Sequence, residues 1–137
     1  MKFPNTLLVV TGPTACGKTA LSIQLANTLH TEIINADSRQ FYKELSIGTA
    51  RPTEKELMQA PHHFVGHKSV IDTYSAGDFE SDVLSILPGL FAKHPVVILT
   101  GGSGMYIDAV CNGISPLPET DAKIRSEVIQ QYQKEGI

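Results

Sequence analysis

Residues 12–19 read GPTACGKT and lie between an apolar run at residues 7–10 and a segment with helical periodicity at residues 20–29. A glycine-rich turn that joins a strand to a helix and ends in Gly-Lys-Ser/Thr is the fingerprint of a phosphate-binding loop. Glycine lets main-chain N–H groups approach phosphate closely, and the N-terminus of the following helix adds donors and a favourable dipole. The sequence therefore predicts a phosphate-binding loop directly after a first strand.

The residues of this loop have separate expected roles. We expect Lys18 to place a positive charge on the terminal phosphate, and Thr19 to offer its hydroxyl to Mg2+, an ion that bridges protein to phosphate. We expect the whole stretch to surround the phosphates: Gly12, Pro13, Thr14, Ala15, Cys16, Gly17, Lys18 and Thr19. The loop does not identify the phosphate compound, because nucleotide-binding hydrolases, kinases and other diphosphate users share it.

Composition limits the classes of protein that remain. A length of 137 residues fits one compact domain, and a formal net charge of −3 gives no global basic field of the kind that attracts nucleic acid. No apolar run approaches the roughly 20 residues that a membrane-spanning helix needs. The N-terminus has no pattern of a cleaved leader, so we expect a cytoplasmic protein without membrane association. Cys16 and Cys111 predict neither a disulfide framework nor a metal site.

The remaining elements alternate between strand and helix. Apolar runs bounded by turn residues predict strands at residues 6–11, 32–36 and 96–100. Periodicity and capping signals predict helices at residues 18–29, 53–59, 75–93 and 105–112, and a last helix capped by Thr120 or Asp121 after an extended connector at residues 114–118. Pro88-Gly89 predicts a kink or an early end of the third helix. The alternation predicts an α/β fold with a parallel sheet.

Polar residues gather where the second strand ends. Asp37-Ser38-Arg39-Gln40 follows that strand, and ligands of open α/β sheets bind at this edge. These side chains can serve as proton acceptor, metal ligand and base-edge contact. Asp37 or Ser38 can equally act as the N-cap of a short helix, so both interpretations remain open.

A second glycine-rich turn, residues 101–104, follows the strand at 96–100. Alone it indicates tight packing of a helix on a strand, but two such turns at one sheet edge favour a shared ligand site. The strand ends in Thr100-Gly101, where many nucleotide hydrolases carry an acid that helps to position Mg2+. Because Asp37 is the nearest acid of that kind, the sequence disfavours ordinary ATP hydrolysis.

Three histidines lie close together at His62, His63 and His67. Adjacent residues of a strand point to opposite faces, and the usual spacings of zinc ligands are missing. We therefore favour structural hydrogen bonds or polar contacts on the substrate side over a metal site.

Taken in order, these blocks resemble the tRNA dimethylallyltransferase family, also called tRNA isopentenyltransferases or IPP transferases. The resemblance is carried by GPTACGKT, NADSRQFYKELSIGTARP, APHH, YSAGDF, LTGGSGMYIDAV and GISPLP, which together span almost the whole chain. It is more specific than the phosphate loop alone. It implies a P-loop NTPase-like three-layer sandwich, with a parallel sheet and helices on both faces.

The resemblance implies transfer of a dimethylallyl group from dimethylallyl diphosphate to N6 of the adenosine adjacent to the anticodon in tRNA, with Mg2+ and release of diphosphate. The phosphate loop would hold the diphosphate of the prenyl donor, with Lys18 and Mg2+ stabilising the leaving group. Asp37 matches the catalytic aspartate that accepts the N6 proton. The positions matched to tRNA contact are Asp37, Ser38, Arg39, Gln40, Ser103 and Arg125. The expected partners are the anticodon stem-loop and dimethylallyl diphosphate, bound by a monomer.

The chain departs from the family pattern in three mild ways and in its length. Cys16 stands where serine is common, Arg51 where lysine is common, and Ser103 where threonine is usual. Cys16 adds a thiol open to oxidation in the loop. Family members are roughly twice as long. The resemblance thus identifies residues 1–137 as a single P-loop core domain, the N-terminal part of a longer enzyme, without its helical tRNA-gripping region and C-terminal part, and inactive or feeble alone.

Three other functions fit parts of the sequence. An adenylate isopentenyltransferase, which prenylates free AMP, ADP or ATP, shares the loop and the aspartate, but the DSRQ and GTARP blocks look more like the tRNA enzymes. A small-molecule or nucleotide kinase fits the loop and the size, but it needs a set of acceptor-binding arginines that the sequence does not show. A phosphate-binding module without catalysis is the third alternative.

Overall fold

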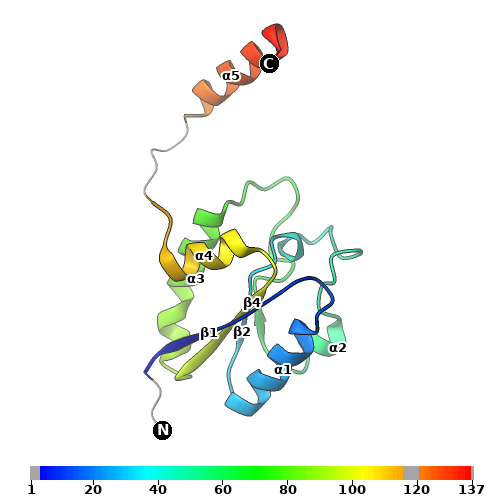
Figure 1. Cartoon of the computed structure of the whole chain (residues 1–137), viewed down its shortest axis with the longest axis vertical. Helices are drawn as coiled ribbons and strands as arrows, with labels where there is room; N and C mark the ends of the chain where they lie inside the picture. Colours follow the sequence, from blue (N-terminus) through cyan, green and yellow to red (C-terminus); the bar gives the residue numbers. More distant parts are fainter. Residues whose placement is uncertain (1–3, 116–120, 137) are drawn as a thin grey trace.

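The structure, a computed structural model, describes residues 4–115 and 121–136. Its sheet contains four parallel strands in the order β1-β4-β2-β3 (Figure 1). The strands are β1 (Thr6–Thr11), β2 (Ile33–Asn35), β3 (His62–His63) and β4 (Val96–Gly101). The predicted parallel α/β fold is therefore confirmed. The second strand is shorter than predicted, although ladder-like hydrogen bonds still reach the carbonyl of Glu32 and the N–H of Ala36 at its two ends.

The helices are α1 (Lys18–Leu29), α2 (Glu54–Leu57), α3 (Ala76–Phe91), α4 (Gly104–Asn112) and α5 (Ala122–Glu135), and a 3-10 helix, η1, covers Ser38–Phe41. Side-chain caps begin α2, α3 and α5, whereas α1 and α4 begin without one. Capping boxes start α2 and α3: Thr53 pairs with Glu56, and Ser75 pairs with Asp78. Asp121 caps α5 by accepting a hydrogen bond from the N–H of Lys123 at 2.8 Å. The alternative cap Thr120 and residues 116–118 of the predicted connector lie outside the described residues.

Helices cover both faces of the sheet (Figure 1). On one face, Ile23 of α1 packs in a cluster with Ile33 and Ile98. On the other face, a larger cluster joins Ile34 and Leu99 to buried residues of α3 and α4. Because neighbouring strand residues point to opposite faces, consecutive residues of β2 contribute to different clusters. The predicted three-layer sandwich is confirmed.

The third helix does not end early at its proline. Pro88 lies inside α3, which continues to Phe91, so the helix predicted at residues 75–93 is confirmed, and an early end, one of the two alternatives at Pro88-Gly89, is wrong. The carbonyl of Pro88 accepts a hydrogen bond from the N–H of Ala92 at 3.0 Å, which closes the last turn. Leu87 and Leu90 are buried on either side of the proline. Their packing offsets the main-chain hydrogen bond that proline removes.

The main chain just after β2 lies close to Gly101, the last residue of β4. A Cβ atom at this position would lie 2.3 Å from the carbonyl oxygen of Ala36 and 2.4 Å from its carbonyl carbon. Both are main-chain atoms, which cannot rotate away as a side chain can. We expect Gly101→Ala to lower the free energy of unfolding by about 3 kcal/mol or more, as measured by urea denaturation.

Gly104 provides the matched control, because an added Cβ there meets no heavy atom within 4 Å and the residue begins α4. Gly104→Ala should leave stability unchanged or raise it by up to about 1 kcal/mol. Equal stabilities for the two alanine variants would show that the approach at Gly101 is not restrictive.

An aromatic cluster fixes the end of η1. Phe41 is fully buried, stacks on Phe79 with ring centroids 5.1 Å apart, and meets His67 edge-on at 5.4 Å. Both ring nitrogens of His67 are buried and make no hydrogen bond within the described part of the chain. Burial lowers the pKa of His67, the nearby Lys68 ammonium lowers it further, and Asp82 opposes this shift. The folded protein therefore disfavours protonation of His67.

Acid should destabilise the fold through His67. As the pH falls below the ordinary histidine value of about 6.5, the unfolded chain takes up a proton that the folded chain resists, so the free energy of unfolding falls. His67→Phe should remove this part of the pH dependence, as measured by urea denaturation at about pH 7.5 and about pH 5.5. His30→Asn, a change at an exposed histidine, is the control. An unchanged pH dependence in His67→Phe would contradict the prediction.

The last helix stands apart from the α/β body in Figure 1. Each of its residues that the structure describes is exposed. Within the two described ranges, residues 4–115 and 121–136, no helix is both long and apolar enough to cross a membrane.

Candidate active site

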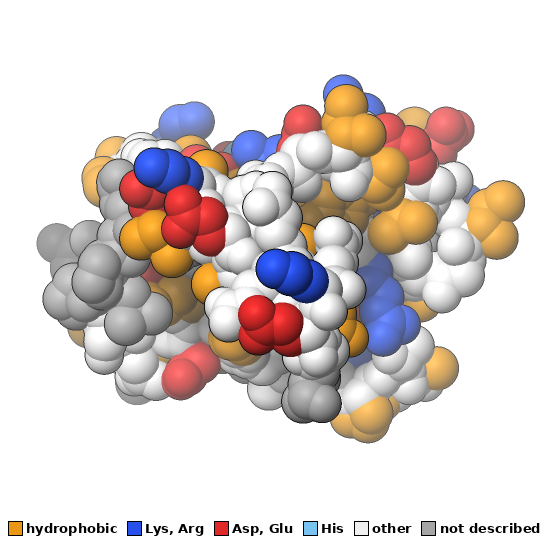
Figure 2. Space-filling model, turned by 90° about the horizontal axis from the view of Figure 1, so that it is seen from above, with side chains coloured by type: hydrophobic (Ala, Val, Ile, Leu, Met, Phe, Trp, Pro, Cys, Tyr) orange, Lys and Arg blue, Asp and Glu red, His pale blue; other side chains and the backbone are white. Residues whose placement is uncertain are grey.

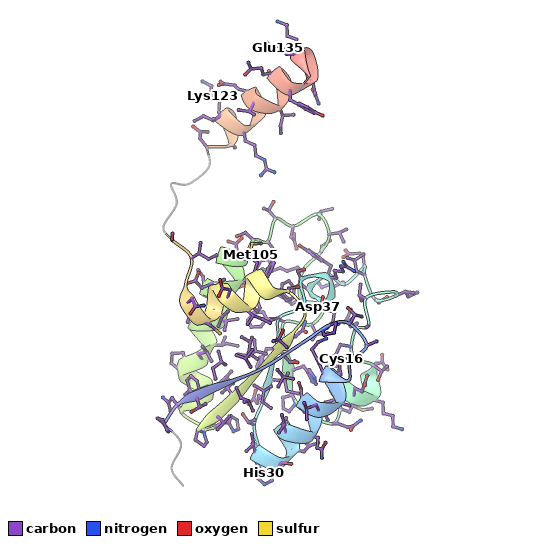
Figure 3. The ribbon with its side chains drawn as sticks, viewed as in Figure 1. Cys16, His30, Asp37, Met105, Lys123 and Glu135 are labelled. Atoms are coloured by element: carbon purple, nitrogen blue, oxygen red, sulfur yellow. The ribbon has the colours of Figure 1, made fainter. Side chains whose placement is uncertain are left out.

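Two cavities lie at the carboxyl edge of the sheet. The larger, of about 300 Å3, is lined by residues 14, 15 and 17–19 of the phosphate loop, the ends of β2 and β4, and parts of the segment from Gln40 to His62. The smaller, of about 190 Å3, is lined by residues 37–39, Gly48, Thr49 and the second glycine turn. Thr14 and Asp37 line both cavities. Figure 3 labels Cys16 of the loop and Asp37 at this shared edge.

The phosphate loop turns into α1 at Gly17, whose φ of 91° lies in the left-handed region that favours glycine. Lys18 begins the helix, and its Nζ donates a hydrogen bond to the carbonyl of Pro13 at 2.6 Å. The same Nζ lies 3.8 Å from Sγ of Cys16. The ammonium group therefore lies over the loop.

Asp37 uses its two carboxylate oxygens differently. Oδ1 accepts a hydrogen bond from the N–H of Arg39 at 3.1 Å and so caps η1. Oδ2 lies beside Gly102, where an added Cβ would be 3.9 Å from it and 3.7 Å from the carbonyl oxygen of Gly12. The cap interpretation is confirmed for one oxygen, and the other remains at the cavities. The two glycine turns also meet at one crevice, as the sequence predicted.

Asp37 lines both cavities, whereas the other carboxylate of the larger cavity, Glu56, does not line the smaller one. Glu56 accepts hydrogen bonds through Oε2 from the N–H and the hydroxyl of Thr53, both at 2.8 Å. Thr100 stands where nucleotide hydrolases often carry an acid. Its hydroxyl donates to the carbonyl of Val10 at 3.2 Å and accepts from Ser22 at 2.9 Å. Thr100 therefore links α1, β1 and β4.

Ser38 and Ser103 join the aspartate segment to the second glycine turn. The N–H of Ser38 donates to Oγ of Ser103 at 2.9 Å, and the two hydroxyl oxygens are 3.1 Å apart. Both residues line the smaller cavity together with the exposed Arg39. The structure does not bring Arg125 to this place, because Arg125 is exposed on α5 and lines neither cavity.

The neighbouring histidines point to different surroundings. His62 lines the larger cavity, donates from Nδ1 to the carbonyl of Ala60 at 2.8 Å, and has its pKa lowered by burial. His63 instead binds Glu32 through Nε2 at 2.7 Å, and His94 reaches the other carboxylate oxygen at 3.3 Å. The hydrogen bond from His63, with help from His94, lowers the pKa of Glu32. Structural hydrogen bonding is therefore confirmed for His62 and His63, but not for His67, whose ring nitrogens make no hydrogen bond within the described residues.

Sequence reasoning missed one wall of the site. Residues 48–50 and Pro52 line the cavities, although they belong to no regular element. Gly48 and Pro52 mark this stretch as a loop in the sequence, but only the folded chain shows which cavity it borders.

The donor groups around the loop suit Mg2+. Thr19 and Asp37 line the same cavity as Lys18, and together they offer a hydroxyl and a carboxylate, the hard oxygen ligands that this ion prefers. Within residues 4–115 and 121–136, no three His, Cys, Asp or Glu side chains form a metal-binding cluster. Such an ion would therefore need ligands from phosphate and water as well, as is usual for Mg2+.

The family model for IPP transferase matches residues 40–137, more than half of the chain. The chain belongs to the IPP transferase family. It is 51% identical over 132 residues to tRNA dimethylallyltransferase 1 of Bacteroides thetaiotaomicron, covering 96% of this chain and 43% of that relative. It is 49% identical over 131 residues to tRNA dimethylallyltransferase of Flavobacterium johnsoniae, covering 96% and 42%. The chain therefore spans less than half the length of these IPP transferase relatives.

Solved structures of IPP transferases share the fold. The full-length tRNA isopentenylpyrophosphate transferase of Bacillus halodurans aligns with a TM-score of 0.78 and 32% identity, over 96% of this chain and 44% of that one. A eukaryotic dimethylallyltransferase described as acting on tRNA aligns with a TM-score of 0.75 and 27% identity, over 88% and 31%. These neighbours have a P-loop NTPase-like fold, so this predicted fold class is confirmed.

Proposed function

We propose that this chain provides the donor-binding and proton-accepting parts of a tRNA dimethylallyltransferase. The reaction would transfer a dimethylallyl group from dimethylallyl diphosphate to N6 of the adenosine adjacent to the anticodon in tRNA. The observation that carries this proposal is the position of Asp37, which lines both the cavity of the phosphate loop and the smaller cavity beside it. A carboxylate between two compartments can act on an acceptor in one while the donor is held in the other.

The larger cavity would hold the diphosphate of the donor. The N–H groups at the start of α1 and the ammonium of Lys18 are suited to the developing charge of a leaving diphosphate. Thr19 would help to hold Mg2+, which neutralises part of that charge. Residues 14–19 thus serve a prenyl donor here, although the same motif binds ATP in many other proteins.

The smaller cavity would receive the acceptor adenosine. Transfer forms a bond between N6 and the prenyl carbon, breaks the carbon–oxygen bond to diphosphate, and passes the N6 proton to Asp37. Ser38, Arg39 and Ser103 line this cavity and would contact the tRNA. The adenosine must leave its base stack to enter, as enzymes that act on bases require. We further propose that the protein acts as a cytoplasmic monomer on the anticodon stem-loop, with Arg125 meeting the RNA from α5.

The distribution of charge on the surface affects how strongly this chain can bind tRNA. The net charge of the chain is −3, and Figure 2 shows Lys and Arg side chains interspersed with Asp and Glu on the face seen from above. This face therefore has no continuous basic field of the kind that dominates nucleic-acid affinity. We expect the cavity contacts to provide discrimination, and the affinity of this chain for RNA to be weak.

A graft into the Bacteroides thetaiotaomicron relative tests the proposal. This chain would replace the matching part of tRNA dimethylallyltransferase 1, and label transfer from dimethylallyl diphosphate would be measured to an anticodon stem-loop RNA and to free AMP. We expect labelling of the RNA at the adenosine adjacent to the anticodon. Labelling of AMP alone would favour adenylate isopentenyl transfer. A folded graft that labels neither, beside an active parent enzyme, would contradict the proposal.

A further inference from the structure

Gln40 connects three separate segments of the active-site edge. It lies in η1 and is buried. Its side-chain Nε2 donates hydrogen bonds to the carbonyls of Thr49 and Ala50, both at 3.0 Å. The main-chain carbonyl of Gln40 accepts a hydrogen bond from the N–H of Gly66 at 2.9 Å. Both N–H groups of the amide are therefore committed within the protein.

The segment that Gln40 holds is the loop of residues 45–52. The loop has no helix or strand of its own, and Gly48 and Ala50 have left-handed φ angles of 78° and 51°. This conformation is unfavourable for alanine, so contacts from outside the loop must maintain it. The hydroxyl of Thr49 donates to the carbonyl of Leu45 at 2.7 Å, but this bond is exposed and lies within the loop.

The loop is a wall of both cavities. Gly48 and Thr49 line the smaller cavity, whereas Ala50 and Pro52 line the larger one. The side-chain amide of Gln40 binds the carbonyl of Thr49, which lines the smaller cavity, and the carbonyl of Ala50, which lines the larger one. A shift of the loop would therefore change the shape of both cavities together.

We infer that Gln40 is a positioning residue that fixes loop 45–52 as the shared wall of the two cavities, and that its amide N–H groups do not read a base of the tRNA. A base contact through these N–H groups would have to displace the loop carbonyls that they already bind. Asp37 is the N-cap of η1 and Gln40 lies within it. The position of Asp37 relative to loop 45–52 is therefore fixed by this short helix. The ligands assigned to the cavities rest on the proposed function, but the hydrogen bonds of Gln40 do not.

Hydrogen exchange of the chain without ligand tests the inference. Gln40→Met keeps the size of the side chain but removes both donors. We expect amide exchange within residues 45–52 to rise about ten- to thirtyfold, with exchange in β1 and α1 unchanged. Gln59→Met is the matched control, because the exposed Gln59 amide also donates to a main-chain carbonyl, that of Lys55, at 3.2 Å. The control should leave the loop unchanged.

Gln40→Glu provides a second variant if Gln40→Met does not fold. A protonated glutamic acid can donate one hydrogen bond to the loop carbonyls, whereas an ionised one repels them, and burial raises the pKa of such a group. After correction for intrinsic rates, exchange of the loop should be near that of the unchanged chain at about pH 5 and faster at about pH 8.

Two outcomes would overturn the inference. One is loop exchange that stays unchanged in both variants, and the other is exchange that rises equally across the whole sheet, which would indicate a role in the core. Binding of dimethylallyl thiodiphosphate adds a separate measurement, since we expect it to weaken in Gln40→Met and not in Gln59→Met. If the unchanged chain does not bind this analogue, the proposed function fails, while the exchange results still decide the role of Gln40.

Discussion

Asp37→Asn in the grafted enzyme is expected to lower kcat for prenyl transfer about a thousandfold, while the affinity for a donor analogue stays nearly unchanged. Asparagine can still accept the hydrogen bond from the N–H of Arg39 that caps η1. The variant therefore keeps the turn and loses the proton acceptor beside Gly102. Steady-state kinetics with an anticodon stem-loop RNA and calorimetry with dimethylallyl thiodiphosphate measure the two effects separately.

Asp121 offers a matched control for this substitution. Its carboxylate also caps a helix, by accepting a hydrogen bond from the N–H of Lys123 at 2.8 Å, and it lines neither cavity. Asp121→Asn should leave both kcat and donor affinity unchanged. An equal loss of kcat and donor affinity in Asp37→Asn would instead assign Asp37 to metal binding or structure. An unchanged kcat would remove it from the chemistry.

Lys18→Met is expected to weaken binding of the donor analogue to this chain about a hundredfold. The ammonium of Lys18 lies over the phosphate loop and has no replacement among the side chains that line the larger cavity. Charge-assisted hydrogen bonds to phosphate contribute about 1.5–3 kcal/mol each, which corresponds to roughly ten- to a hundredfold in affinity. Calorimetric titration with dimethylallyl thiodiphosphate and Mg2+ measures the loss.

The control for this prediction is Lys55→Met, which removes the same charge from the exposed face of α2. It should change the affinity little, because Lys55 does not line the larger cavity and salt screens exposed charges. A similar loss in both variants would point to general electrostatic attraction. Unchanged affinity in Lys18→Met would show that the loop does not bind the donor.

The parts of the fold that follow from local signals were predictable. The structure places β1 and α1 at the predicted residues, because an apolar run and a helical pattern flank the phosphate loop on its two sides. Asp37 could be placed at the site before the structure was known, since parallel strands present their carboxyl ends at one edge. The position of the second glycine turn, residues 101–104, was predictable for the same reason, because it follows the carboxyl end of a parallel strand.

Features that depend on contacts between distant segments were not predictable. Pro88 signals a break in the sequence, but the burial of its neighbours Leu87 and Leu90 extends α3 past it. Within the described residues the ring nitrogens of His67 have no hydrogen-bond partner, which arises only when aromatic rings from separate segments surround them. Likewise, Gln40 matches a tRNA contact by resemblance, yet its amide is bound to loop carbonyls nine and ten residues away.

The most direct test of a prenyl-donor site is calorimetric titration of this chain with dimethylallyl thiodiphosphate and, separately, with ATP, both in the presence of Mg2+. The phosphate loop alone fits either ligand, so the comparison asks what the rest of the larger cavity selects. We expect the prenyl analogue to bind more tightly than ATP. Tighter binding of ATP, or no binding of the analogue by the folded chain, would contradict the assignment of this cavity to the prenyl donor.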